Sequence, residues 1–465
     1  MKYNFGMIGL GVMGRNFLLN VADNNYKAYG LDTDAEKVAA LKEEGQGREV
    51  DGTTDMATFV ENLETPRKIM LLVPAGKVVD IVIHDLLKYV EEGDLIIDGG
   101  NSHYNDTTRR VQELESKGIH FIGVGVSGGA KGARFGPSIM PGGNAEAYAK
   151  VAPIFEAVSA KVGEDPCVAH MGKGAAGHYV KMVHNGIEYG LMQLLAEAYD
   201  LLKQVGGLNN QEIHAVFSEW NAGRLRSFLV EITAAIFAQK DDLTEGDLID
   251  NILDKAKQKG TGKWTSQNAM DIGIPIPTID SAVTMRGLSA LKQERLAADA
   301  IHPSPLVDYA EDKAAFIAHL EEATYFAFVV TYAQGLALLA DASTEMNLDL
   351  NLETTAKIWR GGCIIRADLL ETIRRAYTSN PDLANLILAA ELRQDLAKAQ
   401  NSMREVLKAA IDRHIPLLTM GSTLHYYDAY HTGRLPLNLV QAQRDYFGSH
   451  TYERVDQDGV FHTEW

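Results

Sequence analysis

The stretch MIGLGVMG, residues 7–14, places glycines at positions 9, 11 and 14 directly after an apolar run. The following stretch MGRNFLLNVADN has apolar residues at the spacing of a helix. In such a strand, turn and helix, Gly9 makes the tight turn, Gly11 admits a pyrophosphate, and Gly14 lets the helix close on the sheet. The helix N-terminus then faces the phosphates. The stretch predicts a dinucleotide-binding unit, and the alternative is a glycine-rich turn without a ligand.

Outward from this stretch, short apolar runs alternate with helix-like segments as far as about Pro166. The runs are NFGMIGL, KAYGL, KIMLLVP, DLIIDGG and HFIGVGV. This alternation predicts a Rossmann-type α/β domain with a parallel sheet. After Gly177 long segments carry apolar residues at helical spacing, which predicts an all-helical region. We expect a dinucleotide-binding domain at 1–176, a large all-α domain at 177–424 and a C-terminal tail at 425–465.

Two long segments of the helical region resemble each other, at residues 178–204 and 316–343. Each is followed by a similar stretch, LNNQEIHAVFSEWNAG after the first and LNLETTAKIWRGG after the second. We therefore expect an internal duplication of a helical unit. The alternative is the general likeness of any two helices in a bundle. The tail, rich in Tyr and broken by Gly433 and Pro436, has too little apolar periodicity to fold alone, so its aromatic residues are expected to dock on another surface.

The composition excludes several classes of partner. The 465 residues include 44 Lys and Arg against 62 Asp and Glu, giving a formal charge of −18. Such a charge repels polyanions, so neither nucleic acid nor an anionic membrane surface is expected as a partner. We expect no bilayer-spanning run and no targeting leader at the N-terminus. The two cysteines, Cys167 and Cys363, cannot build a disulfide framework or a cysteine metal site, which favours a cytoplasmic location.

Asp32 follows the second apolar run, 18 residues beyond Gly14. An acid near this spacing hydrogen-bonds the adenosine ribose of a dinucleotide. The alternative is a helix cap, because Asp34 and Glu36 open the next helix-like segment. Both roles are compatible if Asp32 binds the ribose and Asp34 is the cap.

Lys181, His184, Asn185 and Glu188 are spaced at i, i+3, i+4 and i+7, which places them on one helical face. Their neighbours along the chain are apolar, and unpaired charge is costly to bury. The functional interpretation is a reactive polar stripe. The alternative is a solvated face with an ordinary lysine-glutamate pair.

Several cations are candidates for binding an anionic substrate. The stretch QKGTGKWT places Lys259, Thr261 and Lys263 in a glycine-rich turn that departs from the Walker pattern. Further candidates are Arg286, Arg444 and His450, and the alternative for each is a surface or structural role. Because no group of His, Cys, Asp or Glu has convincing metal-ligand spacing, we expect chemistry without a metal.

Taken together, the motifs resemble one family along nearly the whole chain, the decarboxylating 6-phosphogluconate dehydrogenases of the pentose phosphate pathway. The matching stretches are GLGVMG, DGGNSHYNDT, GVGVSGGAKGARFGPSIMPGG, HYVKMVHNGIEYG, QKGTGKWT, IWRGGCIIRA and QAQRDYFGSHTYE. The resemblance implies a dinucleotide-binding domain, a large helical domain with a duplication, and a tail that inserts into the partner of a homodimer. It also implies oxidative decarboxylation of 6-phosphogluconate to ribulose 5-phosphate.

The resemblance implies a role for individual residues as well. Lys181 would be the general base and Glu188 the general acid. Substrate contacts would come from Asn101, Ser127, Gly128, Gly129, His184 and Asn185. The substrate phosphate would contact Tyr189, Lys259, Thr261 and Arg286, with Arg444 and His450 supplied by the other subunit's tail. The cofactor would contact Gly9, Gly11, Val12, Met13, Gly14, Asp32, Thr33, Asp34, Val73 and Asn101.

Two stretches depart from the family pattern. Ala130 and Lys131 stand where an acidic pair is usual. In LDTD, residues 31–34, the residues Asp32, Thr33 and Asp34 stand where family members that use NADP usually have asparagine, arginine and threonine. We therefore expect the protein to prefer NAD and to use NADP less efficiently. The alternative is that Lys37 or Arg48 pairs with the 2′-phosphate of NADP, which would allow NADP to bind.

Two other functions remain open for the whole chain. One is a short-substrate β-hydroxyacid dehydrogenase, which shares the glycine pattern and a helix lysine. The other is a catalytically inactive nucleotide-sensing or structural protein.

Overall fold

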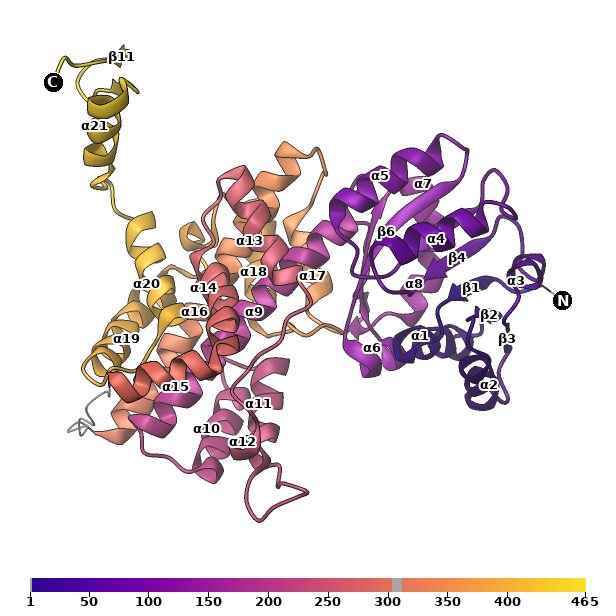
Figure 1. The fold of residues 1–465 in the computed structure, drawn as a ribbon, viewed down its shortest axis with the longest axis horizontal. Coiled ribbons are helices and arrows are strands. Elements are labelled where there is room, and N and C mark those ends of the chain that lie inside the picture. The colour runs from indigo at the N-terminus through magenta and orange to yellow at the C-terminus, as the bar shows by residue number, and fades with distance from the viewer. Residues whose placement is uncertain (1, 303–311) are drawn as a thin grey trace.

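The computed structural model describes residues 2–302 and 312–465 and contains an α/β part, a helical part and a protruding tail (Figure 1). The sheet has seven strands in the order β3-β2-β1-β4-β5-β6-β7. Its strands are β1 (Phe5–Ile8), β2 (Ala28–Leu31), β3 (Val50–Thr53), β4 (Lys68–Leu71), β5 (Leu95–Asp98), β6 (His120–Ser127) and β7 (Ser138–Gly143). Its helices are α1 (Val12–Asp23), α2 (Ala35–Glu44), α3 (Met56–Glu61), α4 (Lys77–Leu86), α5 (Tyr104–Glu115), α6 (Gly129–Phe135), α7 (Ala145–Ala149) and α8 (Ala152–Val158).

The sheet confirms the predicted Rossmann-type α/β class, and all five predicted strands are present. Neighbouring strands from β3 to β6 pair in parallel, whereas β7 pairs antiparallel with β6. The expectation of a parallel sheet is therefore wrong for its last strand. The sequence pattern did not predict β7, because Pro141, Gly142 and Gly143 are unfavourable in strands. Proline is tolerated there because β7 lies at the edge of the sheet. The strand β3 was also missed because VDGT contains no apolar run.

Apolar residues cover both faces of the sheet. On β4, Ile69 belongs to one core cluster and the next residue, Met70, to the cluster on the opposite face. Ile96 and Ile97 on β5 alternate in the same way. Strands buried on both faces read as continuous apolar runs, which is why these two were predictable. The strand order reverses between β1 and β4, and this switch point is where dinucleotides bind in such sheets.

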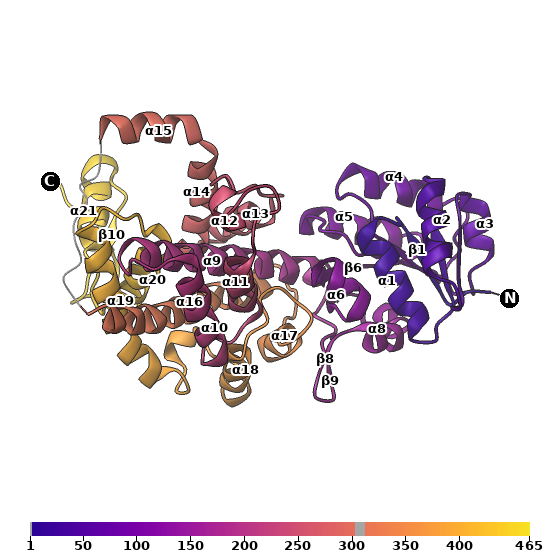
Figure 2. The same ribbon diagram turned by 90° about the horizontal axis from the view of Figure 1, so that it is seen from below.

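The helical part begins with a long helix, α9, that reaches back to the sheet (Figure 2). A Cβ added at Gly177 would lie 2.3 Å from the carbonyl oxygens of Gly123 and Met140, so α9 starts in direct backbone contact with β6 and β7. The helices are α9 (Ala176–Gln204), α10 (Asn210–Ala222), α11 (Phe228–Ala238), α12 (Leu248–Asn251), α13 (Thr261–Ile272), α14 (Pro277–Ala290), α15 (Lys292–Ile301), α16 (Lys313–Glu345), α17 (Leu352–Trp359), α18 (Leu369–Ser379), α19 (Arg393–Ile411) and α20 (Leu418–Tyr430).

The helix order agrees with the predicted duplication. In each unit a long helix, α9 or α16, precedes a shorter helix whose first turn is capped by an asparagine, Asn209 or Asn351. The two long helices pack closely, because a Cβ added at Gly335 would lie 2.5 Å from the Ile187 side chain. Glycine at this crossing lets the backbones approach, which brings the two units together around α9.

The helix α16 corrects one expectation from the sequence. It is long and apolar enough to cross a membrane by length and composition, although we expected no such run. Within the described residues, 89% of its most apolar window is buried inside the protein. An apolar helix surrounded by other helices is a core helix, so its composition reflects burial.

The first turn of α20 is capped by a side chain from α9. Glu197 is 3% exposed, and its carboxylate accepts hydrogen bonds from the backbone N–H groups of Thr419 and Met420 at 2.9 and 2.8 Å. Burial raises the pKa of Glu197 to about 7, against the opposing effect of these hydrogen bonds. A buried carboxyl group thus ties α9 to the helix that leads into the tail.

The tail has local structure that the sequence did not predict. It contains α21 (Leu437–Gly448) and a hairpin of β10 (Tyr452–Glu453) and β11 (Val460–Phe461), and it protrudes from the body (Figure 1). Asp445, fully buried, accepts hydrogen bonds from Thr451 N, Thr463 N and Trp465 Nε1 at 2.8, 3.1 and 2.9 Å. This small fold is organised by a polar centre, which apolar periodicity cannot reveal. The boundary expected at residue 425 lies inside α20 and stays a prediction.

Candidate active site

The glycine turn between β1 and α1 has the geometry that a pyrophosphate needs. Gly9 has φ +97°, a left-handed conformation that favours glycine. A Cβ added at Gly14 would lie 1.9 Å from the carbonyl oxygen of Gly9, so only glycine permits this closeness of helix and turn. Gly11 has no heavy atom within 4 Å of its added Cβ and faces open space. The conformation and spacing of these three glycines therefore fit a dinucleotide cofactor.

Asp34 has the capping role that the sequence predicted, and the ribose-binding role of Asp32 stays a prediction. The Asp34 side chain caps α2 by accepting from Glu36 N at 3.0 Å. Asp32 lies at the end of β2, and its Oδ2 accepts from Leu10 N at 2.8 Å, beside the glycine turn. A carboxylate has about four lone-pair sites, so Asp32 keeps capacity for ribose hydroxyls.

The two cations considered for NADP differ in their surroundings. Lys37 Nζ lies 3.5 Å from Asp32 Oδ1 and 3.6 Å from Asp34 Oδ2, between the two carboxylates. Arg48 instead pairs with Asp23 and donates to Glu44 O at 3.0 Å. Arg48 is thus held elsewhere, and Lys37 is already shared by two acids.

Three of the four residues of the polar stripe on α9 are buried and the fourth, Glu188, is partly buried with 21% of its side chain exposed, so the alternative of a solvated face is wrong. Lys181 is 7% exposed, His184 is fully buried and Asn185 is 8% exposed. The Lys181 Nζ atom donates to Asn185 Oδ1 at 2.7 Å and lies 3.5 Å from His184 Nδ1. Asn185 Nδ2 in turn donates to Thr261 Oγ1 at 3.1 Å, which connects α9 to the first turn of α13.

Burial moves the ionisation of all three titratable groups on this stripe. It lowers the pKa of Lys181, against the opposing effect of Glu188, and raises the pKa of Glu188, against the effects of Lys181 and Arg286. Burial also holds the pKa of His184 well below its usual value, and the neighbouring Lys181 lowers it further. The shifts of Lys181 and Glu188 are both toward the uncharged form, the direction that a general base and a general acid require.

A turn of the second helical unit, directly after α17, packs against the segments at the start of α6 and of β7. A Cβ added at Gly128 would lie 2.5 Å from the Gly362 carbonyl oxygen, and the same oxygen accepts from Ser138 N at 2.9 Å. The Trp359 ring packs edge-on against His184 at 5.6 Å between centroids. The stretch IWRGGCIIRA could not be given a role from the sequence, because nothing in a single sequence shows that it lies against α9.

Ser127, Gly128 and Gly129 lie where β6 ends and α6 begins. Ser127 Oγ is 3.4 Å from His184 Nε2, and the two glycines have φ +122° and +62°. These left-handed backbones turn the chain sharply beside α9. Ala130 and Lys131, the departures from the family pattern, are exposed in the first turn of α6.

The residues expected at the substrate phosphate lie around the glycine-rich turn before α13. Gly260 has φ +104°, and Thr261 starts the helix. The Arg286 guanidinium stacks on the Tyr189 ring at 3.4 Å from its centroid and donates to Lys257 O at 3.1 Å. Lys259 is exposed in the same turn. A helix N-terminus with nearby cations suits a phosphate.

Other predicted site residues lie on separate loops or on the tail. Val12 and Met13 start α1, Val73 follows β4, and Asn101, exposed, follows β5. Arg444 lies on α21 and His450 just beyond it, on the part of the tail that stands apart from α9 (Figure 1). Within one chain the structure therefore does not bring these two residues to Lys181. Among residues 2–302 and 312–465, no three His, Cys, Asp or Glu side chains gather as metal ligands would, and the need for a metal stays untested.

A dinucleotide turn at the switch point, with a buried lysine and a partly buried glutamate on the first helix of the second domain, defines a two-domain, nicotinamide-dependent dehydrogenase. Residues 4–181 match the NAD binding domain of 6-phosphogluconate dehydrogenase, and residues 177–465 match the C-terminal domain of 6-phosphogluconate dehydrogenase. The chain belongs to the 6-phosphogluconate dehydrogenase family.

Relatives cover the full length of the chain. It is 50% identical over 465 residues to the NADP(+)-dependent, decarboxylating 6-phosphogluconate dehydrogenase of Bacillus subtilis, covering 100% of this chain and 99% of that protein. It is 50% identical over 469 residues to the decarboxylating enzyme of Escherichia coli, covering 100% and 99%. The solved structure of Plasmodium falciparum 6-phosphogluconate dehydrogenase, described with NADP+ and with 6-phosphogluconate, superposes with a TM-score of 0.97 at 44% identity, covering 99% of this chain and 100% of that one.

Proposed function

We propose that this protein catalyses the oxidative decarboxylation of 6-phosphogluconate to ribulose 5-phosphate and carbon dioxide. The observation that carries the proposal is the pair on α9, a buried Lys181 whose pKa is lowered and a partly buried Glu188 whose pKa is raised. A relative that had lost the reaction would have no need to keep a lysine and a glutamate in this costly environment. Full-length relatives whose names include this activity support the same proposal.

In the proposed first step, neutral Lys181 takes the proton of the hydroxyl group on the third carbon. The hydrogen on that carbon departs with its electron pair as hydride, and the nicotinamide cofactor, when bound, accepts it. The hydroxyl oxygen becomes a carbonyl, so the product is a 3-keto acid. Asn185 orients the lysine through their 2.7 Å hydrogen bond, and the bond from Asn185 to Thr261 fixes the amide in turn.

In the second step the bond between the carboxylate and the second carbon breaks. Carbon dioxide leaves, and the electron pair of that bond forms an enediolate with the 3-keto group. Ser127 and neutral His184 supply polar groups beside this charge. Glu188 then gives its proton to the carbon that lost the carboxylate, which yields the product.

A short-substrate β-hydroxyacid dehydrogenase is the less favoured function. Such an enzyme needs no phosphate contacts, whereas this chain places Thr261, Tyr189 and Arg286 in one region next to α9. The proposal assigns this region to the 6-phosphate, with Lys259 from the same turn.

The proposed cofactor is NAD rather than NADP. Asp32 accepts the two adenosine ribose hydroxyls, whereas the 2′-phosphate of NADP brings close to two negative charges against Asp32 and Asp34. Lys37 offsets part of this repulsion but is shared by both acids, and Thr33 contributes no cation. The Bacillus subtilis relative is named NADP(+)-dependent, so the acid pair of this chain is the feature that supports the opposite preference.

The proposed assembly is a homodimer in which each tail completes the partner's phosphate site. The helix α21 leaves apolar side chains exposed, among them Leu439 at 61% and Phe447 at 72%. Exposed apolar side chains on a protruding helix are costly in water and suit docking on a second copy. Arg444 and His450 would then reach the other subunit's Arg286 region.

The test is a panel of purified protein with 6-phosphogluconate and with short β-hydroxyacids, each with NAD and with NADP. Absorbance of the reduced cofactor and release of carbon dioxide are both followed. Reduction coupled one to one with carbon dioxide, only with 6-phosphogluconate, is the expected result. Reduction without carbon dioxide would favour the hydroxyacid function, and no reduction with any substrate would favour an inactive protein.

A further inference from the structure

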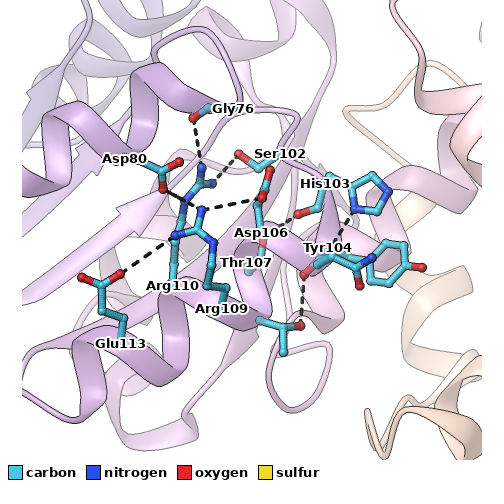
Figure 3. A network of polar contacts seen from close by, with 12 residues as sticks. Gly76, Asp80, Ser102, His103, Tyr104, Asp106, Thr107, Arg109, Arg110 and Glu113 are labelled. Atoms are coloured by element: carbon cyan, nitrogen blue, oxygen red, sulfur yellow. Dashed lines mark hydrogen bonds and ion pairs between the residues drawn. The ribbon is translucent and has the colours of Figure 1, made fainter.

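Arg110 on α5 is a buried cation that joins two loops of the α/β domain (Figure 3). Its side chain is 1% exposed. Its Nη2 donates to the Gly76 carbonyl oxygen at 3.0 Å, and its Nε donates to Asp80 Oδ1 at 2.8 Å. Both partners belong to the start of α4, directly after the loop that contains Val73.

The same guanidinium also reaches the loop after β5. Arg110 Nη1 donates to Asp98 Oδ2 at 3.2 Å and to Ser102 Oγ at 3.3 Å. Ser102 Oγ donates to Asp98 Oδ2 at 2.6 Å, and Gly100 N donates to Asp98 Oδ1 at 3.1 Å. These bonds fix the residues on both sides of Asn101, while Asn101 itself stays exposed.

The two joined loops follow β4 and β5, at the carboxyl edge of the sheet and on one side of the switch point. This edge is where the nicotinamide half of a dinucleotide lies in doubly wound sheets. Gly76 has φ +86°, so its carbonyl direction depends on a backbone conformation that favours glycine. Arg110 holds that carbonyl and the Asn101 loop at a fixed separation.

The start of α5, directly after the Asn101 loop, contacts the helical domain. Thr107 Oγ1 is 2.7 Å from Nδ1 of the buried His178, which lies one turn before Lys181 on α9. Tyr104 OH accepts from Asn268 Nδ2 at 2.8 Å, and the His103 ring packs edge-on against Trp264, with 5.0 Å between centroids. The loop and the start of α5 that follows it are therefore held between Arg110 on one side and the helices α9 and α13 on the other.

We propose that Arg110 is a positioning residue for hydride transfer, which sets the Asn101 loop and the Gly76 turn at the separation that aligns cofactor and substrate. The inference rests on the proposed function, because it concerns the geometry of that reaction. Burying a guanidinium is costly unless every donor is paired, and here it is paired with two acids, a hydroxyl group and a carbonyl. Those partners come from the two loops that border the expected nicotinamide pocket.

The decisive variant is Arg110→Lys, which keeps one positive charge but loses the planar guanidinium group with its several N–H donors. A single Nζ atom cannot reach Gly76 O, Asp80 and Asp98 together, so one side chain no longer joins the two loops. Misplacement of reacting groups by about 1 Å can cost on the order of 100-fold in rate. We expect kcat to fall roughly 10- to 100-fold, with little change in the KM for 6-phosphogluconate.

The matched control is Arg109→Lys on the same helix. Arg109 also binds Asp80, at 2.9 Å, but its side chain is 51% exposed and its other partners are Asp106 and Glu113. It contacts neither Gly76 nor the residues around Asn101, so kcat should stay within about twofold of the unmodified protein. Ser102→Ala is a second test variant, because it removes one hydroxyl group between Asp98 and Arg110 without leaving a charge unpaired, and its kcat should fall several-fold.

The readout that separates positioning from general destabilisation is the kinetic isotope effect with substrate deuterated at the third carbon. If hydride transfer is the slowed step, the effect in Arg110→Lys equals or exceeds that of the unmodified protein. An unchanged kcat, or a lower kcat with a smaller isotope effect, would overturn the inference. If Arg110→Lys does not fold, Ser102→Ala decides by the same criteria. Absence of turnover in the unmodified protein would refute the proposed function instead.

Discussion

The Nζ atom of Lys181 donates a hydrogen bond of 2.7 Å to the Oδ1 atom of Asn185, one turn further along the same helix. An amide oxygen accepts from a neutral amine as well as from an ammonium group, so this contact orients the lysine without forcing it to be charged. A carboxylate at position 185 would instead hold the proton on the lysine. Asn185 therefore suits a lysine that must act as a base.

Replacing Lys181 by Met should abolish hydride transfer and leave the fold intact. Methionine has a similar volume but accepts no proton, and loss of general base catalysis costs about 10²- to 10⁴-fold in kcat. Stability should not fall, because the change removes a buried amine whose pKa burial already lowers. Cofactor reduction and Tm are measured together. Lys203→Met is the control on the same helix, since Lys203 pairs with Asp250 near the surface, and near-normal turnover in Lys181→Met would refute the assignment.

The pH dependence of kcat/KM should show two limbs of opposite sign. Lys181 must be neutral, so activity is lost as pH falls through its lowered pKa; Glu188 must be protonated, so activity is lost as pH rises through its raised pKa. Glu188→Gln should lower turnover strongly and remove the alkaline limb while the acid limb stays. If the variant keeps both limbs and normal product formation, another group supplies the proton.

The unmodified protein should use NAD at least roughly tenfold more efficiently than NADP, since one charge-assisted hydrogen bond is worth about 1.5 to 3 kcal/mol. The combined change Asp32→Asn, Thr33→Arg and Asp34→Thr should shift the preference toward NADP. Asp34→Asn alone keeps an acceptor for the α2 cap and should shift it less. Values of kcat/KM for both cofactors decide, and equal use of NADP by the unmodified protein would contradict the prediction.

The fold and the polar stripe on α9 could be predicted from the sequence because both rest on local patterns. Glycine spacing around Gly11 and the i, i+3, i+4, i+7 spacing from Lys181 to Glu188 are visible in a single chain. Whether that stripe is solvated depends on which helices surround α9, and this is a property of packing. The structure resolves the question through burial of His184 and the contact with Trp359.

What the sequence missed depends on contacts between distant segments. Arg110 lies in an ordinary amphipathic helix, and its partners Gly76 and Ser102 come from two other loops. The tail fold depends on Asp445, one acid among 62 Asp and Glu residues. Polar networks of this kind have no periodicity, so neither helical nor strand patterns point to them.

Stability should fall as pH rises toward neutrality because of Glu197. Its pKa is raised from 4.5 to about 7 in the folded state. The stabilising contribution of its protonated form is fully present below pH 4.5 and is lost as pH rises through about 7. The shift corresponds to a free energy on the order of 3 kcal/mol. We expect the Tm difference between the unmodified protein and Glu197→Gln to shrink from pH 5 to pH 8, and a constant difference would contradict the prediction.

Removing the tail before Leu435 should weaken both dimer formation and substrate binding. The cut lies beyond α20, which ends at Tyr430, so the helical body keeps its last long helix. Sedimentation should show monomers, and the KM for 6-phosphogluconate should rise. Arg444→Ala separates the two effects, because it keeps α21 and should raise the KM while the dimer persists. A truncated monomer with full activity would refute the shared site.

The Asp445 centre changes the thermodynamics of the association proposed for the tail. Ordering a flexible segment costs about 1 to 2 kcal/mol per residue in backbone entropy, and this cost is subtracted from the binding free energy. Here Thr451, Thr463 and Trp465 are already tied to Asp445 within one chain. In the proposed dimer the tail would therefore meet its partner as a preorganised body, and most of the free energy from burying Leu439 and Phe447 would remain available to hold two subunits together.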